Sequence, residues 1–162
     1  MFDDLLDANE IYQQRFDLGE LQARAARGLA ILTCMDSRIE PLAMLGIVPG
    51  DAKIMRNAGA RVTEDALRSL VLATNLLGVD RICVVAHTDC AMSKTTDAEL
   101  QARIGAATGA DASGWAFHAV SDQTAVLRAD IELVRACPLI APGTTVAGFV
   151  YDVHTGALTP ID

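Results

Sequence analysis

The sequence predicts an α/β fold with a mostly parallel central sheet flanked by helices, and with an edge strand or hairpin at the C-terminus. Residues 29–36 and 80–90 are near-continuous apolar runs of strand length, which suit strands covered on both faces. Amphipathic helical patterns alternate with these runs, and such alternation is typical of a parallel sheet. The length of 162 residues favours a single domain over residues 1–162, with residues 1–27 as an N-terminal helical arm.

The first half of the chain alternates helical and strand patterns. Residues 5–28 have the pattern of one or two amphipathic helices that end at Gly28. After the first strand, residues 38–51 predict a short helix that Gly46 closes. Residues 52–60 then predict a second strand that runs into a glycine-containing loop.

The second half continues the alternation. Residues 63–78 form the clearest helical pattern, with Thr63 as N-cap and acidic residues in the first turn. After the strand at 80–90, residues 121–138 predict another helix, capped by Ser121. Residues 144–161 predict the hairpin at the edge of the sheet.

The composition predicts neither a nucleic-acid partner nor a membrane partner. The formal net charge is −8, whereas both partners attract a basic surface. No apolar stretch approaches the length of a membrane span, and the acidic start MFDDLLDANE is unlike a signal peptide. We therefore expect a cytoplasmic protein whose four cysteines are metal ligands, reactive thiols or buried small residues rather than disulfide partners.

Metal-binding side chains gather at two predicted strand ends. His87 and Cys90 are close enough in sequence for one loop to present both to one ion, and a parallel sheet can bring Cys34 beside them. Two thiolates and one imidazole suit Zn²⁺ and leave a fourth position open, as a catalytic zinc requires. Asp36 could fill that position, or Arg38 could bind the carboxylate bidentately and hold it off the metal.

These motifs resemble those of the β-class carbonic anhydrases, in their short, single-domain form. CMDSR at 34–38 and HTDC at 87–90 resemble the two zinc motifs of that family, and RNAGA at 56–60 also fits it. GFVYDVHTG at 148–156 is similar to the last strand of the short members, so the resemblance runs from about residue 27 to the C-terminus. The family implies a homodimer or a dimer of dimers, with an N-terminal helix that crosses onto the partner.

The resemblance also implies roles for individual residues. Cys34, His87 and Cys90 would be the zinc ligands, and Asp36 and Arg38 the catalytic pair. In closed forms of the family the aspartate is the fourth ligand, whereas in open forms it pairs with the arginine. The implied reaction is the reversible hydration of carbon dioxide to bicarbonate by a zinc-bound hydroxide.

Further positions are assigned by the resemblance alone. Arg56 and Asn57 would lie beside the site, and together with Ala91 they are the candidate substrate-binding residues. Ala91 stands where many members have glycine, so its methyl group would narrow the pocket. Ile31 stands where members with an inhibitory bicarbonate pocket have tryptophan, so we do not expect that pocket here.

Two other functions stay open at this point. A hydrolase of carbonyl sulfide or carbon disulfide would use the same scaffold and ligands, with Ala91 and a loop over residues 92–115 at an altered entrance. A non-catalytic zinc-binding module is the other alternative. The open fourth position and the Asp36–Arg38 pair speak against it, because structural zinc sites normally have four protein ligands.

Overall fold

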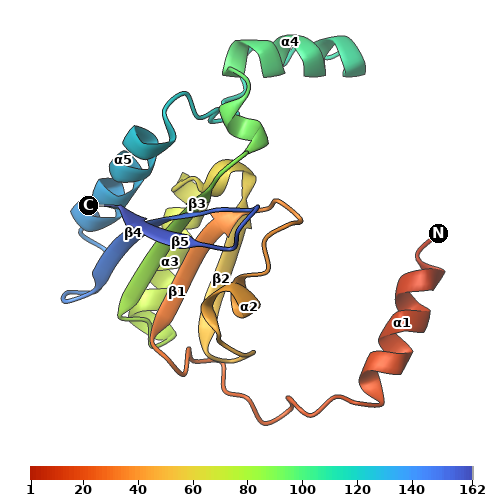
Figure 1. Ribbon diagram of the computed structural model, residues 1–162, viewed down its shortest axis with the longest axis vertical. Coiled ribbons are helices and arrows are strands. Elements are labelled where there is room, and N and C mark those ends of the chain that lie inside the picture. The colour runs from red at the N-terminus through yellow and green to blue at the C-terminus, as the bar shows by residue number, and fades with distance from the viewer. Residues whose placement is uncertain (162) are drawn as a thin grey trace.

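The structure, a computed structural model, describes residues 1–161 and contains one five-stranded sheet in the order β2-β1-β3-β4-β5 (Figure 1). The strands span Leu29–Cys34 (β1), Ala52–Asn57 (β2), Arg81–His87 (β3), Thr145–Tyr151 (β4) and Leu158–Ile161 (β5). Strands β2, β1, β3 and β4 pair in parallel, and β5 returns antiparallel to β4. The predicted α/β sheet with a C-terminal edge hairpin is therefore confirmed.

In the part of the chain that the structure describes, five α-helices and two short 3₁₀ turns connect and flank the strands. The helices span Asp3–Gln13 (α1), Pro41–Leu45 (α2), Glu64–Leu76 (α3), Asp97–Thr108 (α4) and Gln123–Ala136 (α5). The 3₁₀ turns are Ala58–Ala60 (η1) and Ala91–Ser93 (η2). Within residues 1–161, no helix combines the length and the apolar character needed to cross a membrane.

The core lies on both faces of the sheet, as the continuous apolar runs predict. All six residues of β1 are buried. Ala30 and Leu32 pack with apolar residues of α3 and α5, whereas Leu29 and Ile31 pack on the other face with residues of α2. Because β1 is packed on both faces, it is held in place within the sheet. The position of Cys34, its last residue, is therefore fixed as well.

The parallel register brings the chemically active strand ends to one edge of the sheet. Thr33 on β1 lies opposite Val85 on β3, and Cys34 lies opposite Asn57 on β2. His87 ends β3 and lies opposite Tyr151 on β4. The carboxyl ends of four neighbouring strands therefore meet where ligands bind in open α/β sheets.

The segment after α1 is not helical, which corrects the prediction of helices as far as Gly28. The N–H of Ala25 donates to the carbonyl of Leu77 at 2.8 Å, and the N–H of Ala26 donates to that of Gly50 at 2.9 Å. Because these donors are bonded to loops at the base of the sheet, they cannot form the i→i−4 bonds of a helix. Tertiary contacts therefore override the helical pattern of this segment.

The structure corrects two further local predictions. The expected loop over residues 92–115 contains α4, which begins with a capping box: the Thr96 hydroxyl and the Glu99 carboxylate each accept the other residue's N–H. The T-x-x-E pattern was the sequence signal for the start of this helix. The apolar residues of α4 follow the helical period only weakly, in keeping with the fact that none of its residues is buried. In α5 the N-cap is Asp122 rather than Ser121, because the Asp122 carboxylate accepts the N–H of Ala125 at 3.0 Å.

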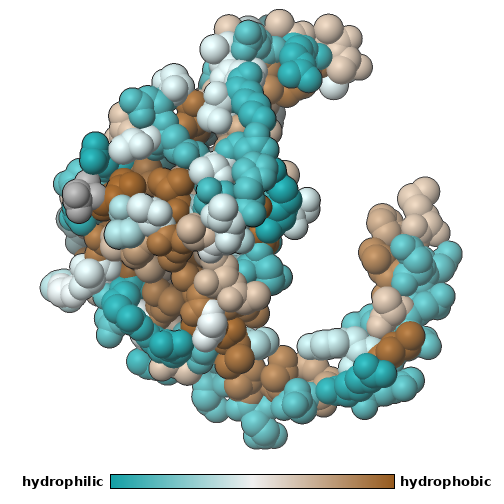
Figure 2. Space-filling view, in the orientation of Figure 1, coloured by the Kyte–Doolittle hydropathy of each residue, from teal (hydrophilic) through white to brown (hydrophobic). Residues whose placement is uncertain are grey.

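Helix α1 stands apart from the sheet, at the end of the N-terminal arm (Figure 1). None of its residues is buried, and apolar side chains lie along its surface (Figure 2). Leu5, Leu6 and Ile11 are exposed there, as are Tyr12 and Phe16, whose rings lie 5.7 Å apart. The arm thus presents an apolar surface that the rest of its own chain does not cover.

Candidate metal centre

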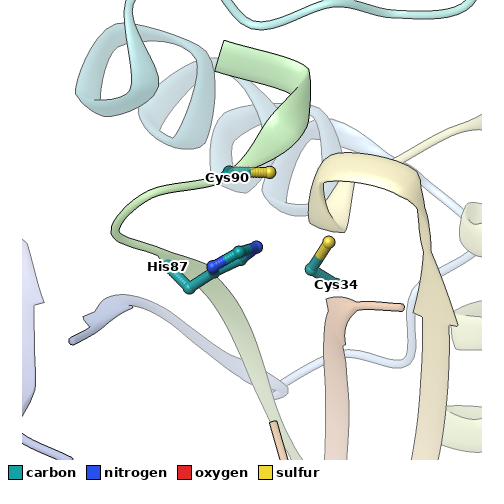
Figure 3. A group of neighbouring side chains, drawn as sticks. All are labelled: Cys34, His87 and Cys90. Carbon is teal, nitrogen blue, oxygen red and sulfur yellow. The ribbon is translucent and has the colours of Figure 1, made fainter. Parts of the chain in front are cut away.

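Three metal-binding side chains meet beyond the ends of β1 and β3. The Cys34 sulfur, a ring nitrogen of His87 and the Cys90 sulfur all lie within 4.8 Å of one another. The three side chains point into one small space (Figure 3). They are almost completely buried, with exposures of 4% for Cys34, 1% for His87 and 3% for Cys90. The structure thus brings together the three residues that the sequence marked as ligands.

The local structure of the HTDC segment explains how His87 and Cys90 face the same point. The chain reverses after His87, with Asp89 in the left-handed region at φ +55°. The N–H of Thr88 donates to the carbonyl of Tyr151 at 2.9 Å, and the Thr88 hydroxyl accepts the N–H of Val153 at 3.1 Å. These bonds tie the turn to the end of β4 and so fix the direction of both ligands.

The hydrogen bonds of His87 leave one ring nitrogen ready for a metal. Nδ1 lies 2.8 Å from the carbonyl oxygen of Thr88, which can only accept, so Nδ1 carries the proton. Nε2 is then an acceptor, and among residues 1–161 it has no hydrogen-bond partner although it is buried. A buried polar atom without a partner is costly, and a metal ion would satisfy it. In a metal-ligating histidine, the ring nitrogen that does not bind the metal normally donates its proton to an oxygen, as Nδ1 of His87 does here.

The two thiols are electrostatically prepared for a cation. The adjacent Cys90 thiol lowers the pKa of Cys34 against the effect of burial, and the N–H of Gly59, which lies 3.4 Å from the Cys34 sulfur, lowers it further. The adjacent Cys34 sulfur and burial raise the pKa of Cys90. Cys34 is thus the more acidic of the two thiols, and a metal cation that bound both sulfurs would displace their protons.

Asp36 lies beside the three donor atoms but is held by Arg38. Nε of Arg38 donates to Oδ1 of Asp36 at 3.0 Å, and Nη2 donates to Oδ2 at 2.8 Å. The backbone N–H of Arg38 also donates to Oδ1 at 2.9 Å. These bonds hold the pKa of Asp36 well below its usual range, so the carboxylate is charged at neutral pH. Arg38 thus engages both carboxylate oxygens of Asp36.

Asp89 is a second partner of Arg38 that the sequence did not single out as a site residue. Its carboxylate accepts from Nη1 of Arg38 at 2.8 Å, and its carbonyl accepts from Nη2 at 3.1 Å. Lys94 forms an ion pair with the same carboxylate, and these two cations lower the pKa of Asp89 to about 2. Arg38 is thus fixed between two aspartates, one from each ligand-bearing segment. The sequence signal for this role was the place of Asp89 in the HTDC motif, between the candidate ligands His87 and Cys90.

The candidate substrate-binding residues take different positions. The guanidinium of Arg56 donates to the carbonyls of Cys34 at 3.0 Å and Asp36 at 2.6 Å. It therefore stabilises the backbone that carries Cys34 and Asp36. The side chain of Asn57 closes the η1 turn beside the site. Ala91 is exposed and follows Cys90 directly, at the start of η2. Their contact with substrate stays a prediction.

Comparison with known proteins places this arrangement in a family. A family model described as carbonic anhydrase matches residues 29–115. β-Carbonic anhydrase 1 of Mycobacterium tuberculosis is 36% identical over 159 residues, which cover 98% of this chain and 96% of the relative. The chain belongs to the β-carbonic anhydrase family. Members of this family are metalloenzymes, and the donor set described above fits a divalent metal ion.

Two further relatives of this β-carbonic anhydrase family member bear on its structure and chemistry. The crystal structure of carbonic anhydrase from Streptococcus mutans is similar, with a TM-score of 0.94 and 37% identity, and it covers 99% of this chain and 97% of that chain. The carbon disulfide hydrolase of Acidianus sp. is 36% identical over 155 residues, which cover 82% of this chain and 76% of the relative. The scaffold is therefore shared by proteins named for two different substrates.

We expect the protein to bind one equivalent of Zn²⁺ per chain, and Cys34→Ala, His87→Ala and Cys90→Ala each to lose it, because two remaining ligands hold the ion poorly. Metal analysis after washing with a chelator measures this. Affinity should also fall as the pH falls, because protons compete for the two sulfurs and Nε2. Cys83→Ala, which removes a thiol in the middle of β3, is the control and should retain the metal. Full retention of zinc by any of the three ligand variants contradicts the assignment.

Proposed function

We propose that this protein is a zinc enzyme that reversibly hydrates carbon dioxide to bicarbonate. The observation that carries the proposal is a set of three buried donor atoms within 4.8 Å of one another, beside a carboxylate that Arg38 holds in place. Membership of the β-carbonic anhydrase family supports it, because a relative of that name matches nearly the whole chain. A structural zinc site normally has four protein ligands, so a set of three favours catalysis.

In this proposal Cys34, His87 and Cys90 hold the zinc ion. Two thiolates and one imidazole are ligands that zinc prefers, and a three-ligand set leaves one position for water. Zinc, when bound, supplies a Lewis acid that lets water lose a proton near neutral pH. The site is buried among apolar residues, which limits the access of bulk water to the reacting atoms.

Asp36 and Arg38 are the proposed catalytic pair. Asp36 is anionic at neutral pH, so its oxygens can accept a hydrogen bond from the attacking water and aim a lone pair at carbon dioxide. Arg38 keeps this carboxylate from turning toward the three donor atoms, where it would act as a fourth ligand. Asp89 stabilises Arg38 in that position from the other side. Arg56, Asn57 and Ala91 are the proposed neighbours of the substrate.

A second candidate function is hydrolysis of carbon disulfide or carbonyl sulfide. The carbon disulfide hydrolase of Acidianus sp. favours it, because that relative is as similar in sequence as the carbonic anhydrases over the part that matches. Ala91 is exposed and follows Cys90 directly, so its methyl group would alter the shape of an entrance at this point. The chemistry would again be attack of an activated water on a linear molecule.

Rates with carbon dioxide, carbonyl sulfide and carbon disulfide, measured side by side on the zinc-loaded protein, decide between the two functions. We expect carbon dioxide hydration to be the fastest reaction by at least about tenfold. Ala91→Gly is the informative variant, since it removes only the methyl group at the entrance. Activity with a sulfur compound alone contradicts the first proposal in favour of the second, and activity with none of the three contradicts both.

We expect Asp36→Asn and Arg38→Ala to lower hydration by about 10²–10⁴-fold while zinc stays bound, because all three ligands are intact. In Arg38→Ala the freed carboxylate competes with water, so part of the rate should return as pH rises and hydroxide becomes more abundant. In Asp36→Asn this recovery should be absent. Because the pKa of Asp36 is lowered, its pairing with Arg38 is present above the ordinary pKa of an aspartate and is lost only when the pH falls below the lowered value.

The control for these variants is Arg68→Ala, which breaks an exposed arginine–aspartate pair on α3, away from the ligands. Its rate, zinc content and pH profile should match those of the wild-type protein. Wild-type rates in both Asp36→Asn and Arg38→Ala would make the pair structural and the catalytic assignment wrong.

We also propose that residues 1–162 form one domain, and that it assembles as a homodimer or a dimer of dimers. The argument is the uncovered apolar surface of the N-terminal arm, which a second subunit would bury.

The four cysteines are unpaired thiols, which suits a reducing compartment and supports a cytoplasmic location. The substrate is a small molecule, and the acidic chain favours neither nucleic acid nor membrane as partner.

Light scattering at micromolar concentration tests the assembly. We expect a mass of at least twice 17.2 kDa for the wild-type protein. The double variant Tyr12→Asp with Phe16→Asp should shift it toward the monomer, because it places two charges on the apolar surface. The control, Gln13→Asp with Gln14→Asp, adds the same charge at polar positions of the same segment and should keep the wild-type mass. A wild-type monomer rules the proposal out.

A further inference from the structure

A buried ion pair lies behind the metal centre, between helix α5 and the chain that follows η1. The Asp130 carboxylate accepts from Nε of Arg61 at 2.8 Å and from Nη2 at 3.2 Å, and it also accepts the N–H of Val62 at 3.2 Å. Asp130 is only 4% exposed. A buried carboxylate is tolerated only when such partners compensate its lost hydration, so this contact holds the two segments together.

The ion pair anchors the turn that touches the Cys34 sulfur. The Asn57 side chain closes the turn: Oδ1 accepts the N–H of Arg61 at 2.8 Å, and Nδ2 donates to its carbonyl at 2.7 Å. Inside the closed turn, Gly59 adopts φ +79° and directs its N–H to Sγ of Cys34 at 3.4 Å. The position of this donor therefore depends on where Arg61 is held.

Helix α5 also contacts the other ligand-bearing segment. Nε2 of Gln123 donates to the carbonyl of His87 at 2.6 Å. Gln123 and Asp130 are about two helical turns apart, so they lie on the same face of α5. One rigid helix thus fixes the loop that carries His87 and the turn that contacts Cys34.

We propose that Asp130 is a positioning residue of the metal centre, which acts through Arg61 to keep the Gly59 N–H on the Cys34 sulfur. The inference rests on the proposed zinc site. Asp130 does not touch a ligand or the reacting atoms, so it is not a catalytic residue. Groups that orient metal ligands typically contribute about 10–100-fold to metal affinity. Asp130 acts on the Cys34 sulfur only through Arg61 and a single N–H···S bond, so we expect its contribution to lie near the lower end of that range.

The test compares Asp130→Asn with Val134→Ala, a substitution of a fully buried apolar residue on the same helix. Both should lower the melting temperature. Only Asp130→Asn should weaken Zn²⁺ binding, by about tenfold in competition with a chromogenic chelator. The same variant, loaded with Co²⁺, should have an altered sulfur-to-metal charge-transfer band, whereas Val134→Ala should have the wild-type spectrum.

Arg61→Lys is a second, milder variant in case Asp130→Asn does not fold. It keeps the positive charge but loses the two-point contact with the carboxylate, so it should show the same changes at smaller size. Wild-type Zn²⁺ affinity and Co²⁺ spectrum in every folded variant overturn the inference alone, since the wild-type protein still binds zinc. A wild-type protein that binds no Zn²⁺ overturns the proposed metal centre and this inference with it.

Discussion

Two sulfurs and a ring nitrogen, buried within 4.8 Å of one another, form a set of donor atoms that a bound cation would stabilise. The adjacent Cys90 thiol lowers the pKa of Cys34, and Nε2 of His87 has no hydrogen-bond partner among residues 1–161. Because all three side chains are buried, solvent compensates these atoms little, and a bound metal ion would stabilise them. The parallel register, the reversal after His87 and the η1 turn all serve to hold three donors at that spacing.

The same requirement explains the charges around the centre. A free carboxylate next to a cation site would bind there, so Asp36 must be held by a stronger partner than water. Arg38 provides this partner, and Asp89 and Lys94 extend the contact into a row of alternating charges. Alternation fixes the direction of each side chain while the row as a whole stays neutral. The proposed catalytic geometry and the electrostatic balance of this region thus depend on the same four residues.

Much of the fold and of the site was predictable because its signals are local. The apolar runs over residues 29–36 and 80–90 mark strands covered on both faces, and the structure has β1 at Leu29–Cys34 and β3 at Arg81–His87 within them. Thr63 caps α3 as predicted, and Gly46 ends α2 in the left-handed conformation. The candidate ligand set was also visible, because two thiols and an imidazole at neighbouring strand ends match the donor atoms that zinc prefers.

The sequence by itself therefore determined the sheet, its edge hairpin and the identity of the candidate metal-binding residues, because these follow from hydrophobic patterning and side-chain chemistry. Only the tertiary structure decided the path of residues 14–28, the pairing of Asp89 with Arg38 and that of Asp130 with Arg61. The two pairs join residues 51 and 69 positions apart. No local pattern encodes such contacts, because they depend on how complete elements pack against one another.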